Sequence, residues 1–233
     1  MYNKRSFLVL AAAVLTVAAL ALAGTGNPNP RVLPPQSDPF GKTYGEWSGA
    51  WWQWAFSIPA WENPVLDLTG EYAAVGQSGP VWFLAGTFGG TAERTVTVPP
   101  GKALFFPIYN YVWVNMPEYG DGPWSPEQEA FARQLSKDQV DNAPAPLACN
   151  IDGYEVADIT AYRCQTPSGE AYMVTLPEDS LWSIYGVLPG TYGPSVDDGY
   201  YLMLAPLPAG THTIHFSAGE YLDVTYHLTV QPH

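Results

Sequence analysis

The 233-residue sequence has little charge, few basic residues and only two cysteines. Charged side chains make up 13% of the chain, and 22 Asp and Glu against 9 Lys and Arg give a net charge of −13 at pH 7. Nucleic acid and anionic lipid are themselves negatively charged, so this composition argues against either as a partner. Aromatic residues reach 14%, and a chain with so many rings must bury them or bind ligands with them.

Familiar catalytic and metal-binding motifs are also missing. The sequence has no G-x-S-x-G nucleophile elbow, no C-x-x-C pair and no EF-hand loop. The acidic positions that calcium would need, at 118–121 and at Asp197 and Asp198, are predicted to be solvated turns. Cys149 and Cys164 are predicted to form a structural disulfide in an oxidising compartment. It would close a loop of about 15 residues and stabilise the fold by roughly 3 kcal/mol.

Residues 1–23 have the pattern of a secretory signal peptide. A basic start at Lys4 and Arg5 precedes an apolar run at 7–22, which ends at the small-residue site Ala21-Leu22-Ala23. Cleavage after this site removes two basic and no acidic residues and leaves a net charge of −15. We therefore predict a secreted or periplasmic protein with no membrane insertion after signal cleavage. The alternative is an uncleaved anchor, because the run approaches the roughly 18 residues that can span a bilayer.

Two segments follow the predicted signal. Residues 24–40 are rich in proline and show no apolar periodicity, so we expect an extended leader. Residues 41–233 have a length typical of one β-domain, and frequent glycine and proline indicate many turns. We therefore predict a single folded domain behind the leader.

A tryptophan-rich helix is predicted at 43–57. Thr43 and Glu46 have the spacing of a capping box, in which both side chains satisfy free backbone N–H groups at a helix start. Pro59 ends the helix because proline cannot continue it. At about 100° per residue, one face carries an apolar stripe for burial. This stripe consists of Trp47, Trp51, Trp54 and Ile58.

The remaining faces of this helix carry a candidate binding site. Trp52 and Phe56 lie on one side, and Glu46 and Gln53 belong to a narrow polar strip. Aromatic faces with polar neighbours suit sugars and apolar ligands, so these four residues form a candidate ligand platform. The alternative is a helix buried between a sheet and a layer of loops, since apolar residues cover most of its circumference.

Short strands separated by turns dominate the sequence from residue 81 onward. We predict an all-β fold, an antiparallel β-sandwich of jelly-roll or immunoglobulin-like type, with the Trp-rich N-terminal helix and one inserted surface helix. The inserted helix is expected at 125–142, where Ser125 and Gln128 form a second capping box. Strands are expected at 81–85, 94–98, 103–108, 147–151, 154–164, 171–176, 199–204, 211–216 and 222–230.

The hairpin formed by the last two strands carries candidate metal ligands. Alternation places His215 and His227 on its outer face about one diagonal step apart, close enough to share an ion, whereas His212 faces the other way. No third ligand is identified. The simpler interpretation is therefore two polar surface residues and no cofactor.

Several patches resemble a family of exported bacterial proteins with no known activity. The resemblance implies export, but it assigns no catalytic or binding residue. The patches are 51–54, 62–64, 76–86, 99–108, 198–201 and 206–216.

Two functions fit these observations. The first is a secreted, non-catalytic binding or structural module of the cell exterior or envelope, with a neutral polysaccharide or an envelope component as ligand. The second is a secreted hydrolase that acts on polysaccharide with carboxylates near the Trp-rich helix, drawn from Glu46, Glu62 and Asp67. Hydrolysis needs two carboxylates facing each other across a cleft, and the sequence does not place such a pair.

Overall fold

A computed structural model describes residue 29 and the ranges 31–116 and 122–232. The chain divides into two compact units, 1–30 and 31–233, and nearly all of the described residues belong to the second. The predicted signal peptide at 1–23 lies outside the described residues. No helix within the described ranges is long and apolar enough to cross a membrane.

Much of the predicted proline-rich leader belongs to the folded unit, which starts at Arg31 rather than at residue 41. Val32 is buried and forms a β-bridge with Leu204. This pairing with a core strand, which the high proline content obscured, orders the segment before the first helix. The segment also forms two short 3-10 turns, η1 (Pro35–Ser37) and η2 (Pro39–Gly41).

Both predicted helices are present at the expected positions. The first, α1 (Tyr44–Phe56), starts at a capping box in which the Thr43 N–H donates to the Glu46 carboxylate at 2.7 Å. The second, α2 (Pro126–Asp141), starts at the other predicted capping box. Most of α1 is buried, whereas most of α2 is exposed. The first helix is therefore a core element, and the second covers part of the surface.

The described chain is mostly β, with two mixed sheets and two α-helices. Sheet A has the order β1-β3-β8-β6, with β7 also paired to β8, and sheet B has the order β2-β10-β9-β4-β5. β1 pairs with β3 and β2 with β10 in parallel, so the prediction of a wholly antiparallel fold is wrong. The strands are β1 (Val81–Phe83), β2 (Gly90–Val98), β3 (Ala103–Val114), β4 (Leu147–Ile151), β5 (Tyr154–Glu155), β6 (Arg163–Gln165), β7 (Tyr172–Leu176), β8 (Gly190–Leu204), β9 (Gly210–Ala218) and β10 (Leu222–Val230).

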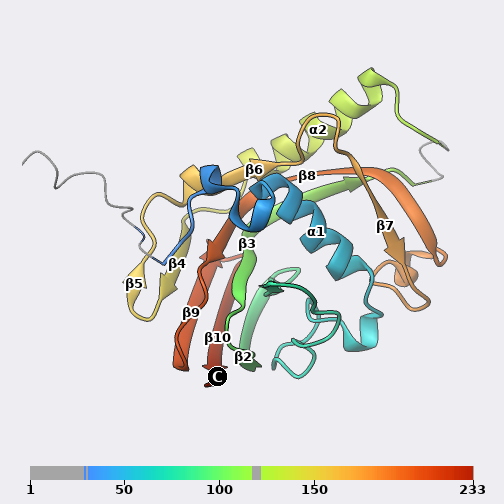
Figure 1. The fold of residues 1–233 in the computed structure, drawn as a ribbon. Helices are drawn as coiled ribbons and strands as arrows, with labels where there is room; N and C mark the ends of the chain where they lie inside the picture. Colours follow the sequence, from blue (N-terminus) through green and yellow to red (C-terminus); the bar gives the residue numbers. More distant parts are fainter. Residues whose placement is uncertain (1–28, 30, 117–121, 233) are drawn as a thin grey trace, which may run out of the picture. The chain divides into compact units, whose positions relative to one another are not determined.

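The parallel pairing of β1 with β3 arises because β2, which lies between them in the sequence, belongs to the other sheet. The turn after β2 carries the chain from sheet B to sheet A, where β3 lies beside β1 (Figure 1). Phe106 of β3 packs on Phe216 of sheet B with ring centroids 5.2 Å apart. The neighbouring Phe105 contacts Tyr44 of α1 at 5.6 Å. Adjacent side chains of a strand point to opposite faces, so α1 and sheet B cover opposite faces of sheet A.

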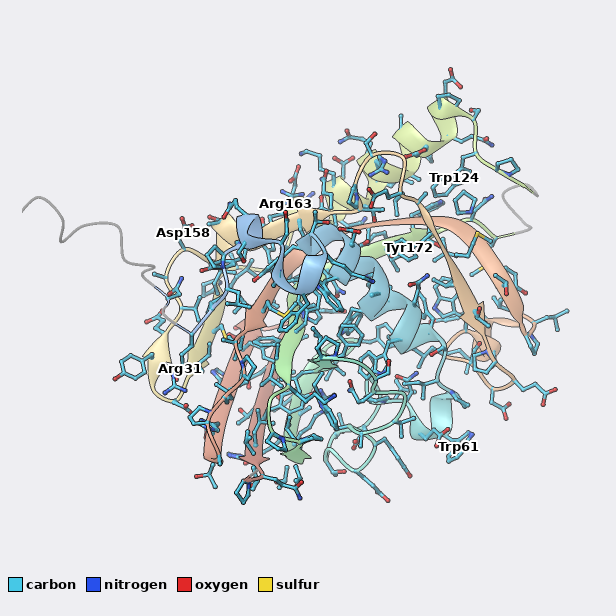
Figure 2. The ribbon with its side chains drawn as sticks, viewed as in Figure 1. Arg31, Trp61, Trp124, Asp158, Arg163 and Tyr172 are labelled. Carbon is cyan, nitrogen blue, oxygen red and sulfur yellow. The ribbon has the colours of Figure 1, made fainter. Side chains whose placement is uncertain are left out.

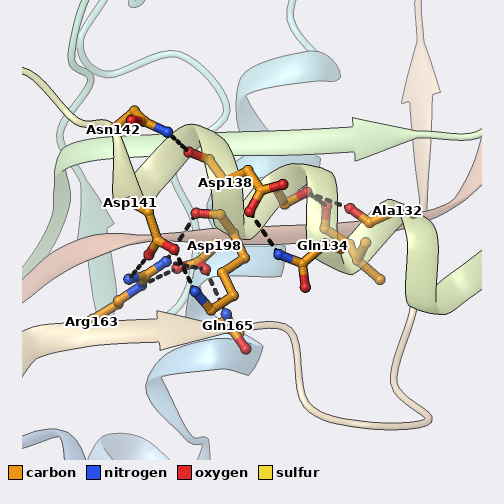
Figure 3. A network of polar contacts seen from close by, with 11 residues as sticks. Ala132, Gln134, Asp138, Asp141, Asn142, Arg163, Gln165 and Asp198 are labelled. Atoms are coloured by element: carbon orange, nitrogen blue, oxygen red, sulfur yellow. Dashed lines mark hydrogen bonds and ion pairs between the residues drawn. The ribbon is translucent and has the colours of Figure 1, made fainter.

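The second helix is attached to sheet A through Arg163 of β6. The guanidinium contacts both carboxylate oxygens of Asp198 in β8, at 2.9 and 2.8 Å, and reaches Asp141 of α2 at 2.6 Å (Figure 3). Asp198 is only 1% exposed. This charged network joins three elements that are distant in the sequence.

Candidate functional site

Trp52 and Phe56, the two aromatic residues of the predicted platform, are buried in α1 and line a pocket. Their rings stack with centroids 5.1 Å apart, and Trp51 meets Trp52 edge-on at 5.0 Å. Phe56 also contacts Trp182, which precedes the short turn η6 (Ser183–Tyr185). The rings therefore form the wall of a hollow rather than an open platform.

The pocket has a volume of about 440 Å³ and lies at the open edge of β3. β1 covers only the start of β3, and beyond Phe105 no described strand pairs with that edge. The walls come from α1, the 86–88 loop, residues 107–112 of β3 and the turn between β9 and β10. Aromatic side chains are frequent, and no charged side chain is found among the described lining residues. A pocket of this size and character suits a small neutral ligand.

Several polar groups lie in or behind the walls of this pocket. The Nε1–H of Trp52 is enclosed by protein atoms and has no hydrogen-bond partner among the described residues. Asn110 of β3 donates from Nδ2 to the hydroxyl of Tyr201 at 2.9 Å. Tyr109 meets Tyr221 edge-on at 6.1 Å, and burial together with the Tyr221 hydroxyl raises the pKa of Tyr109. A buried N–H without a partner costs free energy.

A buried arginine shapes one wall of the pocket. Arg94 of β2 is 1% exposed and forms no ion pair with any described residue. Its guanidinium instead donates to the carbonyls of Asp67, Ala85 and Gly86 and to the Tyr226 hydroxyl, at 2.5 to 3.0 Å. Because Gly86 lines the pocket, Arg94 fixes the position of this wall.

The two polar members of the predicted platform do not reach the pocket. Glu46 caps α1 at the surface, where the backbone N–H of Thr43 lowers the pKa of the Glu46 carboxyl. Gln53 is exposed and donates to the carbonyl of Met173 in β7 at 3.0 Å. Helical periodicity grouped both with Trp52, but Glu46 lies at the N-terminal end of α1 and Gln53 contacts β7.

The carboxylates proposed for hydrolysis are not brought together at the pocket. Glu62 ends the turn η3 (Ala60–Glu62), next to Trp61, which is 65% exposed (Figure 2). Asp67 accepts hydrogen bonds from three backbone N–H groups of its own loop, at 2.8 to 3.0 Å. Burial acts to raise the pKa of Asp67, but these donors outweigh it and hold the pKa below its usual value. Neither these two residues nor Glu46 line the pocket.

The terminal hairpin has the predicted register, with His215 opposite Thr225 and His227 opposite Thr213. Each imidazole faces its own carboxylate: His215 Nε2 lies 3.2 Å from Asp223, and His227 Nε2 lies 3.0 Å from Glu93. His212 faces inward, as predicted, and contacts Asp152 at 2.7 Å. Across the described ranges, no group of three or more His, Cys, Asp or Glu is arranged to hold a metal ion.

The predicted disulfide is not formed, and both cysteines are free thiols. Cys149 lies in β4 of sheet B, whereas Cys164 lies in β6 of sheet A, beside Ser48 and Asp197. The predicted pair therefore joins strands of different sheets. Burial raises the pKa of both thiols.

The prediction of a solvated turn at Asp197 and Asp198 is also wrong, because both residues are buried in β8. Asp197 faces α1, where the hydroxyls of Thr166, Tyr172 and Tyr201 donate to its carboxylate at 2.6, 3.2 and 3.3 Å. Burial raises the pKa of Asp197 to about 6, although the hydroxyl groups oppose this shift.

Sequence reasoning missed several residues that matter to the pocket. Arg94 shares the strand parity of the buried Val96 and Val98, which was the available signal for its burial. Asn110 lies beyond the predicted end of its strand at residue 108, and Tyr221 lies in a predicted turn. No local pattern indicated that these two would meet α1 at one pocket.

Neither protein-family models, curated proteins nor solved structures give a match to this chain. The resemblance to a family of exported bacterial proteins therefore remains a prediction.

Proposed function

We propose that this protein is a secreted, non-catalytic binding module that takes a neutral ligand with a ring-shaped apolar face in the aromatic pocket. The ligand class is a sugar unit of a neutral polysaccharide or of a cell-envelope component. The single observation that carries the proposal is the charge-free pocket of about 440 Å³ that Trp52 and Phe56 help to line.

The chemistry of the lining supports a sugar. Sugar rings present C–H faces that pack on aromatic side chains, as Trp52 and Phe56 offer here, and they carry oxygens that accept hydrogen bonds. An ionic ligand finds no counter-charge among the described lining residues. A hydrolase needs two facing carboxylates, and the pocket walls offer none.

Export and the finer fold class belong to the same proposal. The N-terminal pattern at residues 1–23 supports secretion to the periplasm or beyond. The contact of Phe106 with Phe216 supports face-to-face packing of the two sheets as a β-sandwich. The two parallel strand pairs distinguish this arrangement from jelly-roll and immunoglobulin-like sandwiches.

The test measures binding of four neutral oligosaccharides to the purified exported protein: cellopentaose, laminaripentaose, maltopentaose and chitopentaose. Tryptophan fluorescence reports binding, and chromatography of the sugar reports cleavage. Trp52→Phe removes the unpaired N–H and part of the stacking surface, so we expect affinity to fall about tenfold, which corresponds to about 1.4 kcal/mol.

Trp82→Phe is the matched control. Trp82 is as buried as Trp52 and its Nε1–H is also unpaired, but it does not line the pocket. We expect it to leave affinity unchanged. Absence of binding to all four sugars, or equal losses in the two variants, contradicts the proposal. Release of shortened sugars identifies a hydrolase instead.

A further inference from the structure

A chain of hydrogen bonds leads from the pocket to the buried carboxylate of Asp197. Asn110 lines the pocket, and its Nδ2 donates to the Tyr201 hydroxyl at 2.9 Å. The Tyr201 hydroxyl in turn donates to Asp197 at 3.3 Å. These three residues connect the open edge of β3 with β8, in the centre of sheet A.

The ionised state of Asp197 determines which group donates and which accepts in each of these hydrogen bonds. An ionised carboxylate only accepts hydrogen bonds, so the single hydroxyl hydrogen of Tyr201 is used toward Asp197. The Tyr201 oxygen then serves as an acceptor, and it takes the Nδ2–H of Asn110 rather than Oδ1. The Asn110 amide is thereby held in one of its two orientations, with Oδ1 left as an acceptor.

Gly199 provides the space for this contact. It lies directly opposite Asn110 in the pairing of β3 with β8. A Cβ atom at this position would lie 2.7 Å from the Cβ of Asn110 and 2.7 Å from Cε2 of Tyr201. Any other residue at this position would push the two side chains apart.

We propose that Asn110 is the specificity-determining residue of the pocket, where its Oδ1 accepts a hydrogen bond from a ligand hydroxyl, and that Tyr201 and Asp197 act as positioning residues. The proposal rests on the ligand binding proposed above and narrows it. Asn110 Oδ1 supplies an acceptor among aromatic side chains. A hydroxylated ring satisfies this acceptor, whereas a wholly apolar ring does not.

The surroundings of Asp197 allow its protonation to reverse the hydrogen bonds that connect it through Tyr201 to Asn110. The titratable groups that face it are Cys164 of β6, Tyr172 of β7 and Tyr201 of β8, and no ion pair among the described residues involves it. The other groups are the hydroxyls of Ser48 and Thr166. A protonated carboxyl can donate to the Tyr201 oxygen, which frees the Tyr201 hydrogen to turn toward Asn110. The Asn110 amide then accepts this hydrogen with Oδ1 and turns its Nδ2 toward the ligand.

The test compares Asn110→Leu, Tyr201→Phe and Tyr172→Phe with the unmodified protein, using the four pentasaccharides named above and naphthalene as an apolar ring of similar width. Tyr172→Phe is the control (Figure 2), because the half-buried Tyr172 also donates to Asp197 and yet forms no described hydrogen bond with Asn110. Urea unfolding checks that each variant is folded. If Tyr201→Phe fails to fold, the half-buried Asn110→Leu variant carries the test alone.

We expect Asn110→Leu to weaken pentasaccharide binding about tenfold, the loss of one or two hydrogen bonds, and to leave naphthalene binding intact. Tyr201→Phe should weaken sugar binding about fivefold, and Tyr172→Phe less than about twofold. Sugar affinity of the unmodified protein should fall between pH 8 and pH 5, and Tyr201→Phe should abolish this dependence. A merely structural role of Tyr201 leaves the pH dependence in place.

Three outcomes separate the two proposals. Sugar binding that depends on Trp52 but not on Asn110 overturns the specificity role and leaves the binding function standing. Binding of naphthalene without any sugar overturns the specificity role and the sugar ligand, but not the pocket. No binding of any probe overturns both.

Discussion

Asp197 and Asp198 are neighbours in β8 and are equally buried, but they point to opposite faces of sheet A and have different kinds of partner. On the α1 face, Asp197 is surrounded by hydroxyl groups and has no cationic partner among the described residues. On the α2 face, Asp198 is held by the Arg163 guanidinium through two hydrogen bonds. One carboxylate is stabilised by neutral dipoles and the other by an opposite charge.

Two hollows of the molecule also differ in charge. The aromatic pocket beside α1 is lined by no charged side chain among the described residues. A second hollow of about 690 Å³ beside the end of α2 includes Asp141, Glu155 and Asp158. The charges of this acidic chain are thus kept away from the candidate binding site. A buried carboxylate in a neutral environment changes the electrostatics of its surroundings when it titrates, whereas an ion-paired one stays ionised over a wide pH range.

Removal of the Arg163 cation on the α2 face should cause the largest change in the free energy of unfolding. Arg163→Met leaves the Asp198 carboxylate buried with the Gln165 amide as donor but without a cation, so we expect a loss of about 3 kcal/mol in the free energy of unfolding. Urea denaturation at pH 7 measures it. Arg133→Met is the control, because Arg133 of α2 also binds a carboxylate and two carbonyls but covers no buried acid. Equal losses in the two variants contradict this account of the α2 face.

On the α1 face, Asp197 should make the free energy of unfolding depend on pH. Burial raises the pKa of Asp197 from 3.8 to about 6, so the folded state holds a proton that the unfolded state has released between these two values. The contribution of this group to stability is therefore greatest below pH 3.8 and falls as pH rises through 6, by about 3 kcal/mol in total.

Asp197→Asn removes this dependence. We expect the free energy of unfolding of the variant, relative to the unmodified protein, to increase between pH 4 and pH 8. Urea denaturation at several pH values gives the curve. A constant difference across this range would show that Asp197 does not titrate as proposed.

A smaller effect is expected at the hydroxyl group closest to Asp197. Thr166 Oγ1 contacts the carboxylate at 2.6 Å and accepts from the Asp197 N–H at 2.8 Å. Thr166→Val should cost about 2 kcal/mol at pH 8 and less at pH 4, because a hydrogen bond to a charged group is stronger than one to a neutral group. Thr175→Val, at an exposed position of β7, is the control and should cost less than about 0.5 kcal/mol.

The smallest effect is expected at the outer face of the terminal hairpin, away from both aspartates. Replacing His215 and His227 together by Gln should change stability by less than about 0.5 kcal/mol, since their carboxylate contacts are exposed. Zinc at 1 mM should leave the thermal midpoint unchanged. A rise that the double variant abolishes would show a metal site on this face.

Local patterns predicted the elements well where the signal is contained in a few residues. Thr43 with Glu46 located the start of α1, and alternation located the terminal hairpin and its register. The pairing of β1 with β3 and the separation of Cys149 from Cys164 depend on which sheet each strand joins. That choice is made by packing between distant segments, which strand periodicity does not encode.

The candidate site was predictable only in part for the same reason. The aromatic side of α1 pointed to Trp52 and Phe56, and both line the pocket. Its other walls come from an edge strand, a loop held by Arg94 and a hairpin turn, and no spacing rule relates them. Polar residues at the α1 interface, such as Asp197, were assigned to solvent because the sequence does not reveal the hydroxyl groups that surround them.

The position of β10 inside sheet B has a consequence for the order of assembly. β10 lies between β2 and β9, yet it follows every other described element in the sequence. Until residues 222–230 are available, β2 has no partner in the sheet and one edge of β9 stays open. The pairing of β9, β4 and β5 can form earlier, but the addition of β2 to sheet B is a late, long-range step that favours slow folding. Sheet B stays incomplete until residues 222–230 are in place.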